Sequence, residues 1–174
     1  MTIDWSFRVV CCAAIIVTAP AAQTALAAAI DEAPQVLFVD EKGAEHPLSR
    51  NALAKLPRTT AKVVGRDGEM IEYQGVALPV VLQHCGVTLG KELRGERVAS
   101  YLLCEAKDGY RVVLAIGEVD PATTDKLVLL ADTRDGAPLD DNEGPFRVVI
   151  PDDKRPVRWI RMLNRVAVVR AAQK

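Results

Sequence analysis

The sequence predicts a single α+β domain, a mixed and strand-rich fold with short helices, behind an amino-terminal export signal. Three observations carry this prediction. Short apolar runs recur between turn residues, helix-like stretches are few and brief, and no internal repeat or linker separates the elements. Strands and helices do not alternate regularly, which argues against a parallel βαβ array. A length of 174 residues suits one domain.

Residues 1–27 form the predicted signal peptide, and residues 28–174 form the predicted mature domain. Arg8 precedes an uncharged stretch over residues 9–30 that ends in small residues. A charged start, an apolar stretch and an A-x-A site are typical of a cleaved secretory signal. A retained membrane anchor is the alternative, because about 20 apolar residues can cross a bilayer. We expect cleavage, no twin-arginine export because no Arg-Arg pair is present, and a periplasmic or secreted protein that is not attached to a membrane.

Two short elements open the mature chain. Gln35–Val39 is an apolar run that predicts a strand. A brief helix is expected over Arg50–Lys55, because Ser49 can cap its first turn and Pro57 ends it.

A β-hairpin and a second helix are expected next. Ala61–Val64 and Glu69–Tyr73 should pair around Asp67-Gly68, since a D-G pair suits the positive φ angles of a tight turn. Residues 75–86 predict a short helix, with a proline in the first turn and a glycine just after the end.

The second half of the chain is dominated by strand-like runs. The first two are expected to form a hairpin about Asp108-Gly109, and a polar turn separates the next two. The predicted strands are Val98–Cys104, Tyr110–Ile116, Leu127–Ala131, Phe146–Ile150 and Arg165–Arg170.

Charge is unevenly distributed along the chain. The total is almost balanced, with 22 Lys+Arg against 23 Asp+Glu, which argues against nucleic-acid binding. Residues 105–153 nevertheless carry a net charge of −7, whereas residues 154–174 carry seven bases and no acid. These segments can pair with each other within the fold. Alternatively, the arginines form an anion site, since guanidinium groups make forked bonds to phosphate and carboxylate.

Four motifs follow one another in residues 60–170. They are YQGVAL at 73–78 before a helix ending in CGV, DGY at 108–110, LLA at 129–131 with DGAPL at 135–139, and GPFRVVIP at 144–151 with RWIR at 158–161. Together they make the chain resemble the molybdopterin-binding domain of the sulfite oxidase family of oxidoreductases. The most specific part is G-P-F-R-x-x-x-P followed by R-W-x-R, after D-G-Y. The resemblance implies the mixed, strand-rich fold of that family.

The resemblance also implies a function and a set of site residues. Family members hold molybdenum through a pterin cofactor and one cysteine thiolate, and they transfer an oxygen atom or reduce an oxide of a small, often anionic substrate. By position, Arg147, Arg158 and Arg161 are the candidates for contact with the cofactor, molybdopterin, or with another anion. Asp108 and Tyr110 are the candidate catalytic residues beside the same cavity.

The cysteines of the chain depart from the family pattern. The metal-binding cysteine of the family lies shortly upstream of the aromatic-x-Gly-Val segment, but residues 61–69 contain no cysteine. Cys85 and Cys104 can be buried apolar residues, a disulfide in an oxidising compartment or displaced ligands, so no metal ligand is assigned.

Two functions therefore stay open. One is a molybdopterin-dependent oxidoreductase. The other is a non-catalytic periplasmic protein on the same fold, without the metal site, that binds a small anion, a pterin or a partner protein.

Overall fold

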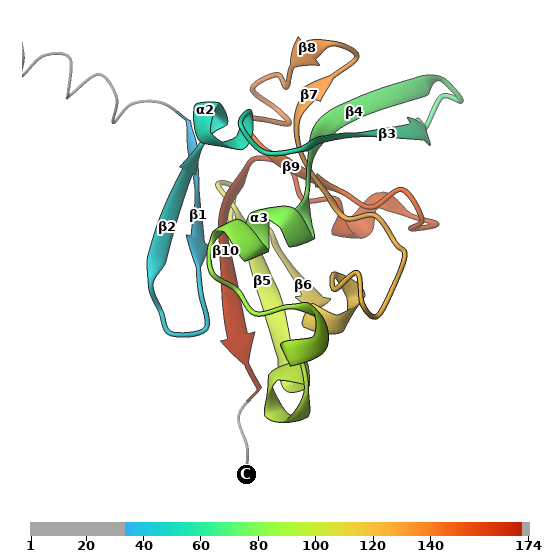
Figure 1. Ribbon diagram of the computed structural model, residues 1–174. Helices are drawn as coiled ribbons and strands as arrows, with labels where there is room; N and C mark the ends of the chain where they lie inside the picture. The colour runs from blue at the N-terminus through green and yellow to red at the C-terminus, as the bar shows by residue number, and fades with distance from the viewer. Residues whose placement is uncertain (1–33, 172–174) are drawn as a thin grey trace, which may run out of the picture. The chain divides into compact units, whose positions relative to one another are not determined.

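Two five-stranded sheets make up most of the domain, as the computed structural model shows for residues 34–171 (Figure 1). These residues belong to one compact unit, 33–174. The strand-rich α+β class predicted from the sequence is confirmed. The predicted signal peptide, residues 1–27, lies outside the described residues.

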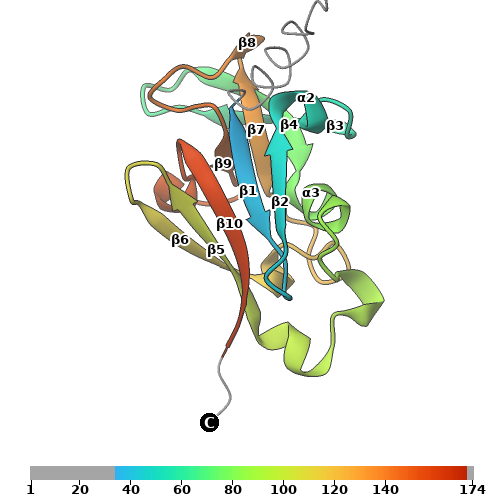
Figure 2. The same cartoon turned by 90° about the vertical axis from the view of Figure 1, so that its left-hand side faces the viewer.

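The first sheet contains both ends of the described chain. Its strand order is β2-β1-β10-β5-β6, and the five strands lie side by side in Figure 2. β1 and β10 pair in parallel, and the other neighbours are antiparallel. The strands are β1 (Gln35–Val39), β2 (Glu45–Ser49), β5 (Ser100–Ala106), β6 (Arg111–Ala115) and β10 (Leu163–Arg170). Residues of β5 alternate between buried and half-buried, as expected for a strand with one face on the core.

The second sheet is built around the β3–β4 hairpin. Its order is β3-β4-β7-β8, and β9 pairs with β7. The register between β4 and β7 shifts between Gln74 and Gly75. A Cβ at Gly75 would collide with the Leu130 carbonyl oxygen, so glycine permits the close approach of these two strands. The strands are β3 (Arg58–Val64), β4 (Met70–Ala77), β7 (Leu129–Arg134), β8 (Ala137–Pro138) and β9 (Arg147–Val149).

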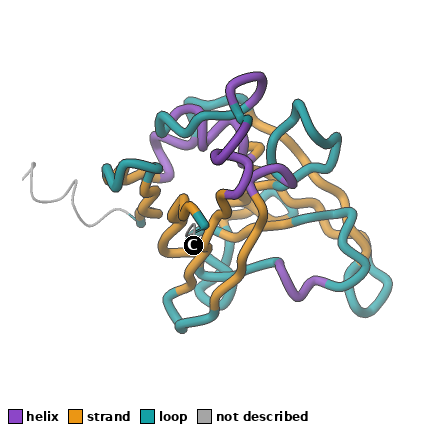
Figure 3. Tube along the Cα trace, turned by 90° about the horizontal axis from the view of Figure 1, so that it is seen from below, coloured by secondary structure: helices purple, strands orange, loops and turns teal. Residues whose placement is uncertain are grey.

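Helices are short and lie at the connections between strands (Figure 3). Ser49 caps α2 (Arg50–Leu53) by accepting a 3.2 Å hydrogen bond from the backbone of Ala52, as predicted. The helix predicted over residues 75–86 begins later, because residues 75–77 pair with β7, and α3 is Leu78–His84. No helix within residues 34–171 is long and apolar enough to cross a membrane. The 3₁₀ helices are η1 (Gly90–Glu92), η2 (Gly95–Ala99), η3 (Ile116–Glu118) and η4 (Pro156–Arg158).

Two clusters of buried apolar side chains stabilise the fold. The larger one joins β1, β5 and β10 to α3 and to the inner side chains of β4 and β9. The smaller one contains Val63, Ile71, Tyr73 and Leu129 from the second sheet. Trp159 packs against both clusters, so it connects the main core to the surface of the second sheet where the cavity described next is found.

Candidate functional site

A cavity of about 680 Å³ lies over the smaller core cluster. The β3–β4 hairpin supplies one side, and the segment from β9 to η4 supplies the other. Alternation along β4 directs Ile71 and Tyr73 to the cavity, and Val63 of β3 joins them. The polar lining of the cavity includes Arg134, Glu143 and Arg147, and all three lie next to the Tyr73 side chain.

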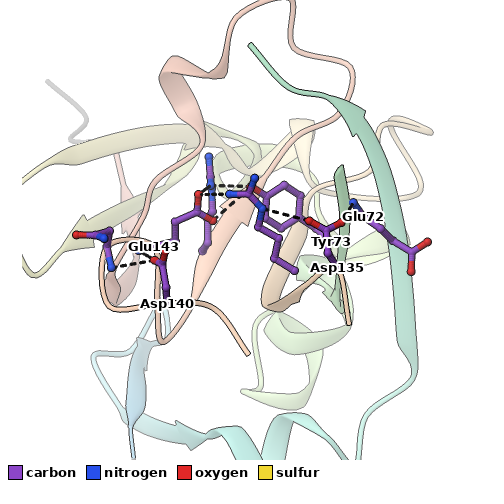
Figure 4. A network of polar contacts seen from close by, with 8 residues as sticks. Glu72, Tyr73, Asp135, Asp140 and Glu143 are labelled. Atoms are coloured by element: carbon purple, nitrogen blue, oxygen red, sulfur yellow. Dashed lines mark hydrogen bonds and ion pairs between the residues drawn. The ribbon is translucent and has the colours of Figure 1, made fainter. Parts of the chain in front are cut away.

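One carboxylate links the polar groups of this cavity (Figure 4). Glu143 Oε1 lies 2.8 Å from Arg147 Nη1 and 2.9 Å from Arg134 Nη1. Arg147 Nη1 also donates to the Tyr73 hydroxyl at 2.8 Å, and that hydroxyl donates to Glu143 Oε2 at 3.3 Å. Two guanidinium groups therefore share the Glu143 carboxylate, and Arg134 also pairs with Asp135 at 3.4 Å, so two acids balance the two arginines.

Arg147 is enclosed by aromatic rings. Its guanidinium carbon lies 5.1 Å from the centre of the Tyr73 ring and 5.7 Å from that of Trp159. These distances suit cation–π attraction. The residue is 9% exposed, and its Nε has no hydrogen-bond partner in the described structure. Burial raises the pKa of Tyr73, although Arg147 opposes this change, so the hydroxyl stays protonated at neutral pH.

A tight loop positions Glu143. Asp140 Oδ1 accepts hydrogen bonds from the backbone N–H groups of Asn142 and Glu143, each at 2.9 Å. The Gly144 N–H donates to the Asp140 carbonyl at 2.7 Å, and the peptide bond that follows Gly144 is cis. The Glu143 carbonyl accepts from Met162 at 2.8 Å. The backbone of the loop that carries Glu143 is therefore fixed at both of its ends.

A second ion pair supports β7 from the side of β3. Arg58 donates to both oxygens of Asp132, at 2.7 and 2.6 Å, and the Asp132 side chain is 4% exposed. Burial acts to raise the pKa of Asp132, but hydrogen bonds from Arg58 and Thr133 outweigh it, and the pKa is lowered overall. Asp132 is thus an ionised structural partner, two residues before Arg134.

The structure separates the site residues predicted from the sequence into three places. Arg147 lines the large cavity. Arg158 is held in ion pairs with Asp153 at 2.6 Å and Glu118 at 2.7 Å, which raise its pKa, and it does not line that cavity. Asp108, Tyr110 and Arg161 come together instead at a smaller cavity of about 200 Å³. Their proposed chemical roles stay predictions.

Contacts of Asp108 and Tyr110 shape the smaller cavity. Asp108 Oδ1 accepts from the Tyr110 backbone N–H at 3.0 Å, which forms a local turn. The Tyr110 hydroxyl donates to the Val157 carbonyl at 2.7 Å. Trp159 lines both cavities, so the two sites share one wall.

Four residues that surround Arg147 in the large cavity were not predicted as site residues. Tyr73 and Trp159 lie within the quoted motifs, so their motif positions were a usable signal. Arg134 and Glu143 lie in a polar stretch that looks like a solvated turn, and only the fold shows that they meet Arg147.

Neither Cys85 nor Cys104 lines the two cavities described above. Cys85 and Cys104 are free, buried thiols of the main core, and they form no disulfide. Burial raises the pKa of Cys85 to about 11 and that of Cys104 to about 12, so both are protonated at neutral pH. The segment that carries the metal-binding cysteine in the resembled family supplies Lys62 to Arg66 to the cavity wall, without a thiol. Across residues 34–171, no three His, Cys, Asp or Glu side chains are grouped to hold a metal ion.

One family model matches most of this chain. The family model of the oxidoreductase molybdopterin binding domain matches residues 49–174. The fold is similar to the crystal structure of the sulfane dehydrogenase SoxCD from Paracoccus pantotrophus, with a TM-score of 0.59 and 18% sequence identity. The match covers 77% of this chain and 37% of that chain, so this chain spans little more than a third of that protein's chain. A comparison with curated proteins finds no match.

Proposed function

Because the chain belongs to the oxidoreductase molybdopterin binding domain family, we propose that its large cavity binds a small organic anion without a molybdenum atom held by a protein thiolate. The lining of the cavity carries this proposal: two arginines, a tyrosine and a tryptophan converge there, and no cysteine does. The chain would then be a binding member of a family of oxidoreductases.

The charge of the cavity favours an anion. Five bases and three acids line the cavity. Arg134 and Lys62 also pair with Asp135 and Glu72, so Arg66 and Lys154 are the lining bases without an ion pair in the described residues. Besides Glu143, the acids in the lining are Glu69 and Asp153, and Asp153 is already paired with Arg158. Charges near the buried Arg147 act in a medium of lower dielectric constant than water, so an anion there gains more than it would at an open surface.

The shape and the rings favour a flat ligand. Small-molecule sites usually occupy about 300–1,000 Å³, and this cavity holds about 680 Å³. Tyr73 and Trp159 meet edge to face, with ring centres 6.4 Å apart. Trp159 is half-buried and offers a stacking surface next to the guanidinium groups, whereas Tyr73 is only 2% exposed. The proposed ligand is therefore a planar heterocycle that carries a phosphate or carboxylate, a class that includes pterins.

A thiolate-bound molybdenum does not fit the residues that are present. The soft metal needs a sulfur ligand from the protein in the resembled family, yet the cavity wall supplies none. Cys85 and Cys104 are protonated and enclosed in the core, where a metal would have no further ligands. We derive no redox step for this chain.

Redox chemistry on a small anionic substrate is the second candidate function. Family membership and the shared fold favour it. This redox function requires that the pterin alone hold the metal, because no cysteine lines the cavity.

Titration with pterin-6-carboxylate, followed by quenching of tryptophan fluorescence, tests the binding function. We expect saturable binding that Arg147→Met weakens by at least about tenfold, because the guanidinium is the buried charge of the site. Arg155→Met is the matched control, since Arg155 is exposed and lines neither cavity, and it should change the affinity less than about twofold. Equal losses in the two variants, or no binding of the probe at millimolar concentration, would refute the proposal.

We also propose that the domain works outside the cytoplasm. The proposal is supported by the predicted signal peptide over residues 1–27. Amino-terminal sequencing of the protein from a periplasmic fraction should find a chain that begins at residue 28. A chain that begins at Met1 in the cytoplasmic fraction would contradict export.

A further inference from the structure

The basic carboxy-terminal segment contains cations of two kinds. Arg158 and Arg165 are neutralised within the fold, by Asp153 and Glu118 and by Glu105 respectively. In contrast, Arg155 and Arg161 are exposed and form no ion pair within residues 34–171. Internal pairing therefore explains only part of the charge in this segment.

Two of the unpaired cations of this segment lie beside the smaller cavity. Arg161 lines it, and Arg155 directly precedes Pro156, which also lines it. Lys107 belongs to the same surface, because its backbone N–H donates to the Met162 carbonyl at 3.0 Å, next to Arg161. Lys107 is exposed and without an ion pair in the described chain. We call Lys107, Arg155 and Arg161 the basic surface; with Asp108 included, its net charge is +2.

Two exposed apolar side chains occupy the centre of the basic surface. Tyr110 is 50% exposed and Val157 is 55% exposed, and both line the smaller cavity. The hydrogen bond from the Tyr110 hydroxyl to the Val157 carbonyl joins the β5–β6 turn to η4, so these elements are held together before any partner arrives. An apolar, aromatic centre inside a polar rim is the usual composition of a protein interface.

We propose that the basic surface docks an acidic segment of a partner protein, with one apolar side chain of that segment inserted between Tyr110 and Val157. The charge of the surface selects the acidic segment. The volume of the smaller cavity favours a single side chain over a free metabolite, because about 200 Å³ is below the range of about 300–1,000 Å³ for small-molecule sites. This inference is independent of ligand binding in the large cavity.

A labelled peptide provides the test: one leucine flanked on each side by three glutamates, titrated with the full mature chain and followed by fluorescence anisotropy. Arg161→Glu should weaken binding by about tenfold, since it replaces an attraction by a repulsion. Lys107→Glu, on the other segment of the surface, should weaken it similarly. Replacing the leucine of the peptide by serine should also weaken binding several-fold.

Arg170→Glu is the matched control. It makes the same change of charge at an exposed residue, but Arg170 pairs with Ser100 at the opposite end of β10 from Leu163. It should change the affinity less than about twofold. Equal effects of Arg161→Glu and Arg170→Glu would overturn the proposal, as would equal affinities for the leucine and serine peptides. Tighter binding to anionic phospholipid vesicles or to a DNA oligonucleotide than to the peptide would assign the surface to those partners instead.

Discussion

Removal of the carboxylate in the large cavity should leave Arg147 without an acidic partner and Arg134 with Asp135 alone. Glu143→Ala removes contacts of 2.8 Å to Arg147, 2.9 Å to Arg134 and 3.3 Å to the Tyr73 hydroxyl. The side chains of Arg147 and Glu143 are 11% and 15% exposed, so water replaces little of what is lost there. Breaking a fully buried pair costs about 3–5 kcal/mol. Because Arg134 is 37% exposed and can be solvated, we expect a loss at the lower end, about 3 kcal/mol of unfolding free energy.

Urea and thermal denaturation, each with and without phosphate, measure both parts of this prediction. The variant should unfold at lower urea, with Tm lower by about 10 °C. Phosphate should enter the vacated position between the arginines and, at 50 mM with a Kd near 1 mM, restore about 2 kcal/mol. Asp141→Ala is the control, since it removes the same charge from an exposed position of the same loop. A loss below about 0.5 kcal/mol, or a phosphate effect equal in variant, control and wild type, would refute the reasoning.

Three further predictions follow from the structure. Asp132→Asn should cost about 2 kcal/mol at pH 7 by weakening the bond to Arg58. Because the pKa of Asp132 in the folded protein lies below its ordinary value of 3.8, this difference should persist above about pH 4 and shrink as the pH falls further. Urea midpoints from pH 3 to 7 measure it, and a difference that does not change with pH would contradict the prediction. Cys85 and Cys104 should not react with a thiol reagent at pH 8 in the folded protein but should react after unfolding, because burial keeps both thiols protonated and out of reach. Rapid labelling of the native chain would contradict this prediction. Gly75→Ala should lower the unfolding free energy by about 2 kcal/mol, because the added Cβ would meet the β7 backbone. Gly117→Ala is the control and should cost under about 0.5 kcal/mol, since the nearest atom to its Cβ belongs to Thr123, at 3.9 Å. Similar losses for the two variants in thermal unfolding would contradict the close approach of β4 and β7.

Local patterns in the sequence predict most of the strands of this fold. The predicted strand Gln35–Val39 is β1, with identical bounds, because turn residues bracket an apolar run. The two D-G pairs predicted to form hairpin turns lie at such turns, and Gly68 and Gly109 have φ angles of +83° and +85°. β2 was missed because it is an edge strand: Glu45 and Pro47 face solvent, so the strand shows neither an apolar run nor an apolar alternation.

The candidate site is less accessible to sequence reasoning, because tertiary contacts assemble it. Tyr73 and Glu143 are 70 residues apart in the chain, and no local pattern indicates that they meet. Arg147 was predicted from its motif, whereas Arg158 is occupied by Asp153 and Glu118, a pairing that the charge imbalance left open. Burial also decided between the three roles considered for Cys85 and Cys104, since the structure places both in the main core as free thiols.

The molybdenum content of protein purified from its native compartment tests the central claim most directly. The metal is quantified by mass spectrometry, and the same sample is oxidised and examined for pterin fluorescence. We predict molybdenum far below one atom per chain, because the cavity around Arg147 and Glu143 offers no thiolate. Pterin without metal would agree with this account and would identify the bound anion. Close to one molybdenum atom per chain would contradict it.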